Sequence, residues 1–460
     1  MTGYWFLMIF QKNSNYPDYK NFNRPFKMKY FYFAAISGYL LVNGQFITIA
    51  QQSNWIQFRG NNLDGISKET GVPTIWNDSV NVVWKAGING KGWSSPVVYG
   101  DQIWLTTASD NGKQMFAVCI SLKSGKELFN IRIFEPGNTY AKHEINTYAS
   151  PTPCIEQGFV YLHFGTYGTA CVKTDDGTVV WKRTDLNCDH IQGPGSSPII
   201  YKNLLILHLE GVDVQYIVAL DKKTGKTIWK TERPKDCYDK LEKNGKKAYI
   251  TPIIINIKGK DLLISNGSAV CIAYDPETGT EVWRVVQGED STISSPFSEN
   301  GIVYFYTGTV SPNDRGGYSE LLAVDPSGSG DVTKTNVLWR FRAPVLQLLT
   351  PLINDGLIYT IDTMNNLFCI DGKTGKTVYI KKLTGKFNSS PVCAGGNIYF
   401  TSTKGETLII KEGRNLEIIS RNRIKGEVFA TPAITHNAII IRAGKSLYCI
   451  LMRNLSRVGG

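Results

Sequence analysis

Short apolar segments recur along the whole chain and are separated by two or three turn-forming residues. Clear examples are PVVYGDQIWLTT (96–107), PLINDGLIYTI (351–361) and PAITHNAIIIRA (432–443). Each contains two runs rich in Val, Ile, Leu and Tyr on either side of Gly, Asn or Asp. Runs of this length and composition predict two antiparallel strands joined by a tight turn. The pattern therefore predicts an all-β chain.

A second pattern alternates with the first. VALDKKTGKTIWKT (218–231) is repeated as IAYDPETGTEVWRV (272–285), FCIDGKTGKTVYIK (368–381) and CVKTDDGTVVWKR (171–183). The Gly can adopt a positive φ in a tight hairpin, and the Asp can accept hydrogen bonds from the free N–H groups of the turn. The aromatic residue that follows is expected to cover the core of a neighbouring unit. These aromatic residues are Trp84, Phe129, Trp181, Trp229, Trp283, Trp339 and Tyr379, with a degenerate copy of the pattern at 411–419.

A small hydroxyl residue followed by Pro marks the start of each unit and recurs at intervals of about 40–55 residues. The eight markers are Ser95, Ser150, Ser197, Thr251, Ser295, Thr350, Ser390 and Thr431. Four antiparallel strands per unit are typical of a β-propeller blade. We therefore predict an eight-bladed β-propeller, because one blade cannot bury both of its faces and a ring of blades can.

The two ends of the repeat region complement each other. The last unit, from 432 to 450, contains three strands and no fourth, whereas VNVVWKAG (80–87) is a fourth strand without the preceding three. Pairing these two segments in one blade would close the ring and remove two exposed sheet edges. The propeller is therefore expected to span 80–452, with a lead-in segment at 51–79 and a tail at 453–460.

The N-terminal region predicts export from the cytoplasm. Lys27 and Lys29 precede an apolar stretch that ends at Thr48-Ile49-Ala50. This is the pattern of a cleaved secretory signal at 28–50, which makes 1–27 an upstream extension of the reading frame. An uncleaved membrane anchor is the alternative reading. The expected location is the periplasm or the exterior, with possible proximity to a membrane.

Charge and cysteine usage exclude several functional classes. The net charge of +11 is spread along the chain without a run of five Lys or Arg residues, which argues against nucleic-acid binding. Four of the nine cysteines, Cys119, Cys271, Cys369 and Cys449, lie in apolar runs, where they are expected to act as small core residues. There is no Cys-x-x-Cys and no Cys/His cluster with zinc spacing, so no metal site is predicted.

Functional residues are expected in the loops of one face. With strands a to d numbered from the axis outward, the d–a and b–c loops share a face, and several d–a loops are long. His143, Glu144 and His190 are candidate acid–base residues. The candidate ligand-binding residues are Trp93, Asn146, Tyr148, Asp189, Gln192, Asp213, Lys386 and Asn388. Further polar b–c loop residues are Glu210, Gln215, Asp314 and Arg315. The alternative for each residue is a structural or merely solvent-exposed role.

The repeat with consensus Ala/Cys-x-Asp-x-x-Thr-Gly-Lys-x-x-Trp resembles the pyrroloquinoline-quinone (PQQ)-type propeller repeat. Quinoprotein alcohol dehydrogenases and the propeller lipoprotein of the outer-membrane barrel-assembly machine contain that repeat. NWIQFRGNNLDGIS (54–67), GKGWSSPVV and HEINTYASPTP resemble exported bacterial propeller proteins more narrowly. The resemblance covers about residues 54–452 and is specific for the fold rather than the function.

Two functional hypotheses remain open. The first is a binding or scaffold propeller without catalysis or cofactor, which presents its loop face to a protein or glycan partner. The second is an enzyme at the axial funnel, either a quinone-dependent oxidoreductase or a carbohydrate-active enzyme that uses His143, Glu144 and His190. The resemblance implies PQQ and Ca²⁺ for the redox version, commonly with a disulfide between adjacent cysteines and a catalytic Asp. This chain has no adjacent cysteine pair.

Overall fold

The computed structural model describes residues 53–310, 317–344 and 348–452. The predicted upstream extension and signal at 1–50, the tail at 453–460, and the loop residues Asp314 and Arg315 lie outside the described residues. Within the described part, no helix is long and apolar enough to cross a membrane.

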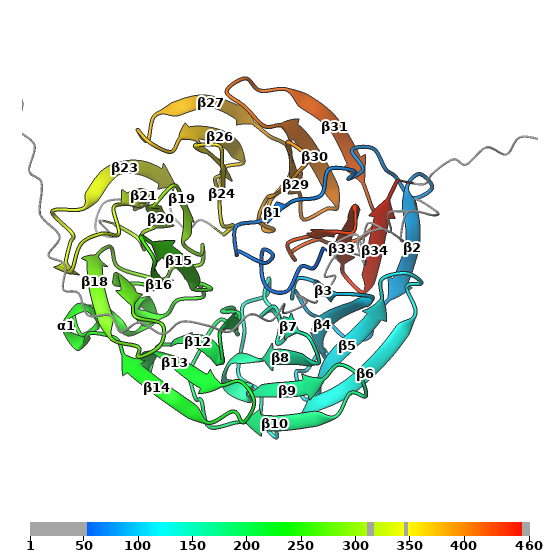
Figure 1. The fold of residues 1–460 in the computed structure, drawn as a ribbon, viewed down its shortest axis with the longest axis horizontal. Helices are drawn as coiled ribbons and strands as arrows, with labels where there is room; N and C mark the ends of the chain where they lie inside the picture. Colours follow the sequence, from blue (N-terminus) through cyan, green and yellow to red (C-terminus); the bar gives the residue numbers. More distant parts are fainter. Residues whose placement is uncertain (1–52, 311–316, 345–347, 453–460) are drawn as a thin grey trace, which may run out of the picture. The chain divides into compact units, whose positions relative to one another are not determined.

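The described residues form eight four-stranded antiparallel blades around an axis (Figure 1). Blades 1 to 3 are, in order, β3 (Val97–Tyr99), β4 (Gln102–Ala108), β5 (Met115–Ser121) and β6 (Glu127–Phe134); β7 (Cys154–Glu156), β8 (Phe159–His163), β9 (Thr169–Lys173) and β10 (Val179–Arg183); and β11 (Ile199–Tyr201), β12 (Leu204–Glu210), β13 (Gln215–Asp221) and β14 (Thr227–Glu232). Blades 4 to 6 are β15 (Ile253–Ile257), β16 (Lys260–Ser265), β17 (Val270–Tyr274) and β18 (Glu281–Val286); β19 (Phe297–Glu299), β20 (Ile302–Tyr306), β21 (Tyr318–Val324) and β23 (Val337–Pro344); and β24 (Leu352–Asn354), β25 (Leu357–Ile361), β26 (Asn366–Asp371) and β27 (Thr377–Lys382). Blades 7 and 8 are β28 (Val392–Ala394), β29 (Asn397–Thr401), β30 (Glu406–Lys411) and β31 (Ile418–Arg423); and β32 (Ala433–Thr435), β33 (Ala438–Ala443), β34 (Ser446–Leu451) and β2 (Val82–Gly87). The predicted eight-bladed all-β fold is confirmed.

Blade 8 contains both ends of the repeat region, as predicted. Its outermost strand, β2, pairs antiparallel with β34, and Trp84 lies opposite Cys449. This pairing covers the free edge of β34 and ties the first repeat segment to the last. The ring therefore closes through main-chain hydrogen bonds rather than side-chain packing alone.

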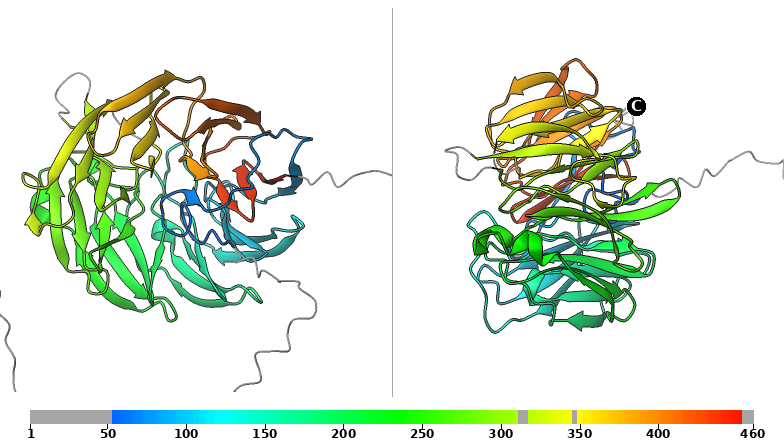
Figure 2. Two further views of the ribbon diagram at one scale, coloured as in Figure 1. Left: turned by 45° about the horizontal axis from the view of Figure 1, so that its top comes forward. Right: turned by 90° about the vertical axis from the view of Figure 1, so that its left-hand side faces the viewer.

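Two blades have a fifth, parallel strand. β1 (Ile66–Ser67) pairs with the innermost strand of blade 7, and β22 (Gly330–Asp331) pairs with the outermost strand of blade 4. Helical structure in the described residues is limited to α1 (Lys235–Tyr238) and two short 3₁₀ turns, Gly165–Tyr167 and Lys243–Lys246. The strands run across the thickness of the ring, so that loops gather on its two faces (Figure 2).

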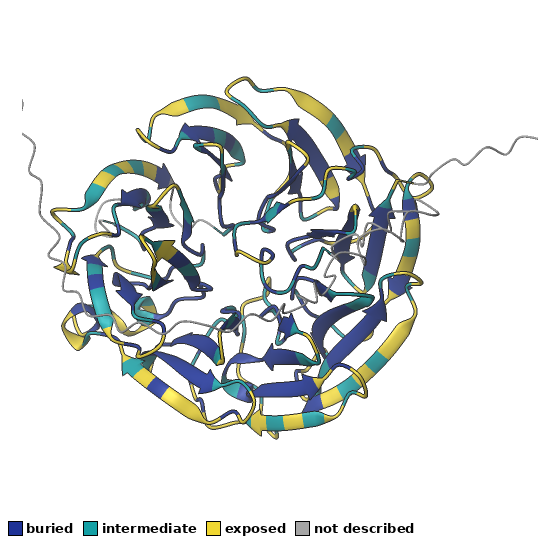
Figure 3. Ribbon diagram, viewed as in Figure 1, coloured by how far each residue is buried: buried dark blue, intermediate teal, exposed yellow. Residues whose placement is uncertain are grey.

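Burial explains why some runs are continuously apolar and others alternate. The inner strands are buried on both faces, whereas the outermost strands alternate mainly between exposed and partly buried residues (Figure 3). The apolar cores lie between adjacent blades; one, for example, joins Tyr161 and Cys171 of blade 2 to Leu205 and Val218 of blade 3. Each blade therefore supplies half of two cores, and the burial stabilises only the assembled ring.

The predicted roles of the repeated turn and its aromatic residue are confirmed. The indole N–H of Trp339 donates to the carbonyl oxygen of Gly372 at 2.9 Å, in the turn of the next blade. In the same turn, Asp371 accepts hydrogen bonds from the backbone N–H and hydroxyl of Thr374. Gly375 has a φ of +69°, a backbone conformation that residues with a side chain rarely adopt. The indole of one blade thus packs on the turn of its neighbour.

All nine cysteines are buried and free, in agreement with the prediction that Cys119, Cys271, Cys369 and Cys449 act as core residues. Burial raises the pKa of the Cys449 thiol to about 12, so the thiol stays protonated.

Replacing Gly375 with Ala should separate turn strain from packing. A Cβ at Gly375 would lie 2.7 Å from the Trp339 ring, whereas a Cβ at Gly356, with a φ of +71°, would meet nothing within 4 Å. Both changes carry the backbone cost of a left-handed residue, about 1–2 kcal/mol. We expect Gly375→Ala to lower the free energy of unfolding by about 1–3 kcal/mol more than Gly356→Ala does. Urea unfolding measures both; equal losses would contradict the indole–turn contact.

Candidate functional site

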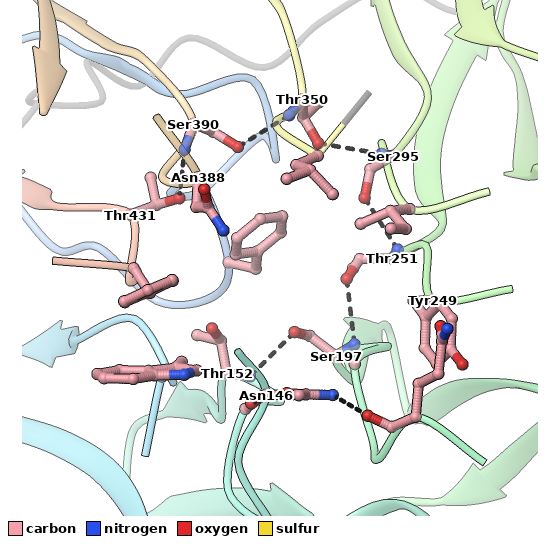
Figure 4. A pocket seen from close by; sticks show the side chains of 18 of the residues that line it. Asn146, Thr152, Ser197, Tyr249, Thr251, Ser295, Thr350, Asn388, Ser390 and Thr431 are labelled. Carbon is pink, nitrogen blue, oxygen red and sulfur yellow. Dashed lines mark hydrogen bonds between the residues drawn. The ribbon is translucent and has the colours of Figure 1, made fainter. Parts of the chain in front are cut away.

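A belt of side chain–main chain hydrogen bonds surrounds the axis. In seven of the eight blades, the residue before the marker Pro donates its backbone N–H to the hydroxyl of the equivalent residue in the next blade (Figure 4). Seven of these bonds measure 2.9–3.1 Å. The belt residues are Ser95, Thr152, Ser197, Thr251, Ser295, Thr350, Ser390 and Thr431.

One marker lies two residues from its predicted place. The repeat pattern predicts Ser150 as the marker of blade 2, but Thr152 occupies the belt position there. The segment Ser150-Pro151-Thr152-Pro153 contains two hydroxyl–Pro pairs, so the pattern cannot distinguish them. The Ser150 hydroxyl instead donates to the side chain of Asn146 at 2.5 Å and stabilises the preceding loop.

The belt surrounds a pocket of about 450 Å³ on the face formed by the d–a loops. Its lining combines the belt hydroxyls with apolar side chains and amides. Trp93 and Phe429 form one wall, where their rings stack with centroids 4.5 Å apart. The indole N–H of Trp93 donates to the carbonyl oxygen of Ile145 at 2.9 Å, which fixes the orientation of the ring.

Phe58 reaches the pocket from the N-terminal lead-in, and we call residues 54–67 the axial segment. This segment pairs with blade 1 at Trp55 and Val98 and with blade 7 through β1, so it crosses the centre of the ring (Figure 1). Arg59 is buried and donates to the carbonyl oxygens of Thr350 at 3.0 Å and Pro351 at 2.8 Å. The axial segment thereby occupies the axis where blades 6 and 7 begin.

Burial lowers the pKa of Arg59 to about 10, and the nearby Asp64 carboxylate opposes this shift. Arg59 therefore remains a cation at neutral pH and keeps its hydrogen bonds to the blades. Its guanidinium anchors the axial segment to blade 6 through main-chain acceptors.

Five of the sequence-predicted residues line the pocket: Trp93, His143, Asn146, Gln192 and Asn388. Two of them join neighbouring loops. The Asn146 amide donates to the carbonyl oxygens of Gln192 at 2.8 Å and Pro194 at 3.2 Å. The backbone N–H of His143 donates to the carbonyl oxygen of Gln192 at 3.2 Å. Both long d–a loops are therefore bound to each other at the pocket edge.

The other predicted residues lie away from the pocket. Glu144 and Lys386 are exposed, and the Tyr148 hydroxyl donates to the carbonyl oxygen of Tyr140 at 3.1 Å. Asp213 accepts the backbone N–H of Asp189 at 2.8 Å and so joins a b–c loop to a d–a loop. These contacts give the side chains of Tyr148 and Asp213 structural roles in the loop face, whereas Asp189 takes part through its backbone.

His190 is buried behind the pocket rather than facing it. Its side chain is only 7% exposed, and Nδ1 lies 3.8 Å from the Cys188 sulfur. Burial lowers the pKa of His190 to about 4, an effect that Asp213 partly opposes. His143 is exposed at the pocket edge, so the two candidate histidines do not face a common space.

Three polar residues that line the pocket are not identified by the sequence patterns. Lys247 and Tyr249 come from the insertion after blade 3, and Asp290 comes from the loop after blade 4. The Lys247 ammonium lies 3.4 Å from a carboxylate oxygen of Asp290. The length of the insertion between Trp229 and Thr251 was the available signal, but neither residue belongs to a repeated pattern.

A buried charged network holds this insertion against blades 3 and 4. Glu210 lies at the end of β12, fully buried rather than in a solvent-exposed loop, and its carboxylate is 3.1 Å from the Arg233 guanidinium. The Tyr238 hydroxyl of α1 donates to Glu210 at 2.7 Å. Burial raises the pKa of Glu210, while Arg233 opposes the rise. The network positions the chain that leads to Lys247 and Tyr249.

The pocket does not fit the calcium-bound quinone that the sequence resemblance implies. Asp290 is the one carboxylate in the described lining, and it is paired with Lys247. No cysteine contributes to the described lining, and no group of three or more His, Cys, Asp or Glu residues in the described part of the chain is placed to hold a metal ion. We therefore derive no step through such a cofactor.

The eight blades, the Asp-x-x-Thr-Gly-Lys turns and the tryptophans that pack on them define a PQQ-like β-propeller. The family model described as outer membrane protein assembly factor BamB matches residues 68–237, 213–333 and 319–419. The chain belongs to this family.

Curated relatives match over parts of their length. Methanol dehydrogenase [cytochrome c] subunit 1 of Methylorubrum extorquens is 25% identical over 207 residues, which cover 40% of this chain and 30% of the relative. Outer membrane protein assembly factor BamB of Nitrosomonas eutropha is 25% identical over 113 residues, which cover 24% of this chain and 27% of the relative. The matched regions span less than a third of either relative.

Solved structures agree with the fold over most of the chain. BamB from Moraxella catarrhalis has a TM-score of 0.55 at 13% identity, covering 80% of this chain and 98% of that chain. Quinohemoprotein alcohol dehydrogenase from Comamonas testosteroni has a TM-score of 0.63 at 11% identity, covering 91% of this chain and 84% of that chain. These similarities show the fold alone.

The buried state of His190 predicts acid sensitivity. Because the folded pKa of about 4 lies below the ordinary value of 6.5, the unfolded chain binds more protons between these values. The stabilising contribution is fully present above pH 6.5 and is lost as the pH falls toward 4, by at most about 3 kcal/mol. His190→Gln should flatten the acid limb of the stability profile. An NMR titration of His190 with a midpoint near 6.5 would contradict this assignment.

Proposed function

We propose that this protein is an exported, non-catalytic binding propeller that presents its d–a and b–c loop face to a protein or glycan partner. The axial pocket is the centre of that face. The observation that carries the proposal is the pocket lining: hydroxyls, amides and aromatic rings surround about 450 Å³, while His143 and His190 are not assembled as an acid–base pair. Such a lining can hold a ligand through hydrogen bonds and ring contacts.

The family supports this assignment by analogy. Its model is named for an outer membrane protein assembly factor, and that role belongs to the named protein. The loop face also has exposed apolar side chains suited to a partner, including Tyr140 at 61% and Met364 at 59% exposure. Export is proposed from the signal pattern at 28–50.

A redox enzyme at the same pocket is the second candidate. Sequence similarity to a methanol dehydrogenase subunit favours it. It ranks second because the described lining has a single carboxylate, which Lys247 already neutralises. Incubating the purified protein with quinone and Ca²⁺ and observing a quinone spectral shift would favour it over the binding function.

Capture of a partner from cell-envelope extracts after crosslinking tests the binding function. The double variant Tyr140→Asp/Met364→Asp places charges on the loop face, and we expect it to reduce partner recovery about ten-fold or more. Ile228→Asp is the matched control, because Ile228 is 55% exposed on the outer strand β14. Recovery of no partner, or equal loss in the control and the double variant, would contradict the proposal.

A further inference from the structure

We propose that the axial pocket is a saccharide subsite that binds an uncharged sugar residue of a glycan. This inference rests on the proposed binding function and names the chemistry of its ligand. Four properties of the described pocket lead to it: the direction of the belt hydroxyls, the unpaired amides, the aromatic wall and the balance of charge.

The belt hydroxyls provide a crown of hydrogen-bond donors. Each of seven belt oxygens already accepts a backbone N–H, so its own hydrogen must find a different acceptor. Among the described residues, none of these seven hydroxyls donates to a protein acceptor, and all line the pocket with side chains only 2–4% exposed. Buried donors without an acceptor are costly, so oxygen atoms of a ligand on the axis would bind favourably.

Two amides add groups that both donate and accept. The side chains of Gln192 and Asn388 line the pocket and make no hydrogen bond to any other described residue. A primary amide offers a carbonyl acceptor beside two N–H donors. A pair of neighbouring sugar hydroxyls, each able to donate and accept, matches this arrangement. A ligand with acceptors alone would leave the amide carbonyls unpaired.

The aromatic wall suits the apolar side of a pyranose ring. Trp93 and Phe429 are stacked, and the hydrogen bond from Trp93 to Ile145 holds the indole in place. Phe58 adds a third aromatic ring from the axial segment. Rigid aromatic side chains contribute contact area at low entropic cost, and the C–H groups of a sugar can pack against them.

The charge of the lining favours a neutral ligand. Lys247 is the one Lys or Arg in the described lining, and its ammonium is paired with Asp290. An anionic ligand would compete with Asp290 for this cation and would gain little net attraction. The volume of about 450 Å³ is within the range of small-molecule sites, so one end of a glycan can enter while the rest crosses the loop face.

Isothermal titration of the full chain with tetrasaccharides tests the inference. The probes are neutral glucose, galactose, mannose and N-acetylglucosamine oligosaccharides, with oligogalacturonate and an acidic peptide as charged competitors. We expect saturable binding of at least one neutral probe that persists in high salt. Asn388→Ala should weaken this binding about ten-fold because it removes an amide that hydrogen-bonds the sugar.

Asn397→Ala is the matched control, because Asn397 begins β29 at an a–b turn on the opposite face. It should bind like the wild type, and circular dichroism and unfolding midpoints confirm that both variants fold. Binding of no neutral probe, preference for the charged ligands, or equal affinity in Asn388→Ala would overturn the saccharide subsite. If envelope capture recovers a partner while no sugar binds, only this inference fails; if neither occurs, the binding function fails with it.

Discussion

The sideways hydrogen bond between belt residues is the constraint on which the ring depends. Hydrophobic burial between blades is non-directional and would tolerate rotation or sliding of one blade on the next. The bond from the backbone N–H of Thr251 to the hydroxyl of Ser295, at 2.9 Å, fixes one atom of each blade relative to its neighbour. The Pro that follows has no N–H, so the innermost strand can begin there without losing a donor. The same geometry, repeated around the axis, sets the radius of the pocket.

A second contact fixes the blades at the outer rim. The indoles of Trp181 and Trp339 donate to carbonyl oxygens in the turns of the next blades. Two contacts at different radii determine the angle between blades, which a single contact could not. Trp283 is the exception: β22 covers it, it is 0% exposed, and its N–H has no partner among the described residues. The inserted strand replaces a polar contact with burial.

Repetition explains which parts were predictable from the sequence. Eight markers and the complementary ends at 80–87 and 432–450 predicted the blade count and the closure, because both depend on local strand and turn chemistry. The axial segment was not predicted to cross the ring, because Arg59 binds main-chain oxygens that any residue provides. His190 illustrates a different limit: its loop folds back over Cys188, and a loop sequence does not reveal which side chains it buries.

The pocket residues likewise differ in how far the repeat predicts their position. Trp93 and Asn388 each lie two residues before a marker, so their distance from the axis follows from the repeat. Lys247 and Tyr249 reach the pocket through a non-repeated insertion held by Glu210 and Arg233. Here tertiary contacts decide which side chains face the axis, and a single sequence does not encode those contacts as a pattern.

The path of the axial segment imposes an order on folding. Residues near the start of the described chain bind blades 1 and 7 and then supply the outer strand of blade 8, hundreds of positions away along the polypeptide. Such distant pairings form slowly, because the intervening chain must first be brought together. The early segment cannot complete its pairings until the last two blades are available, so closure of the ring depends on blades 7 and 8.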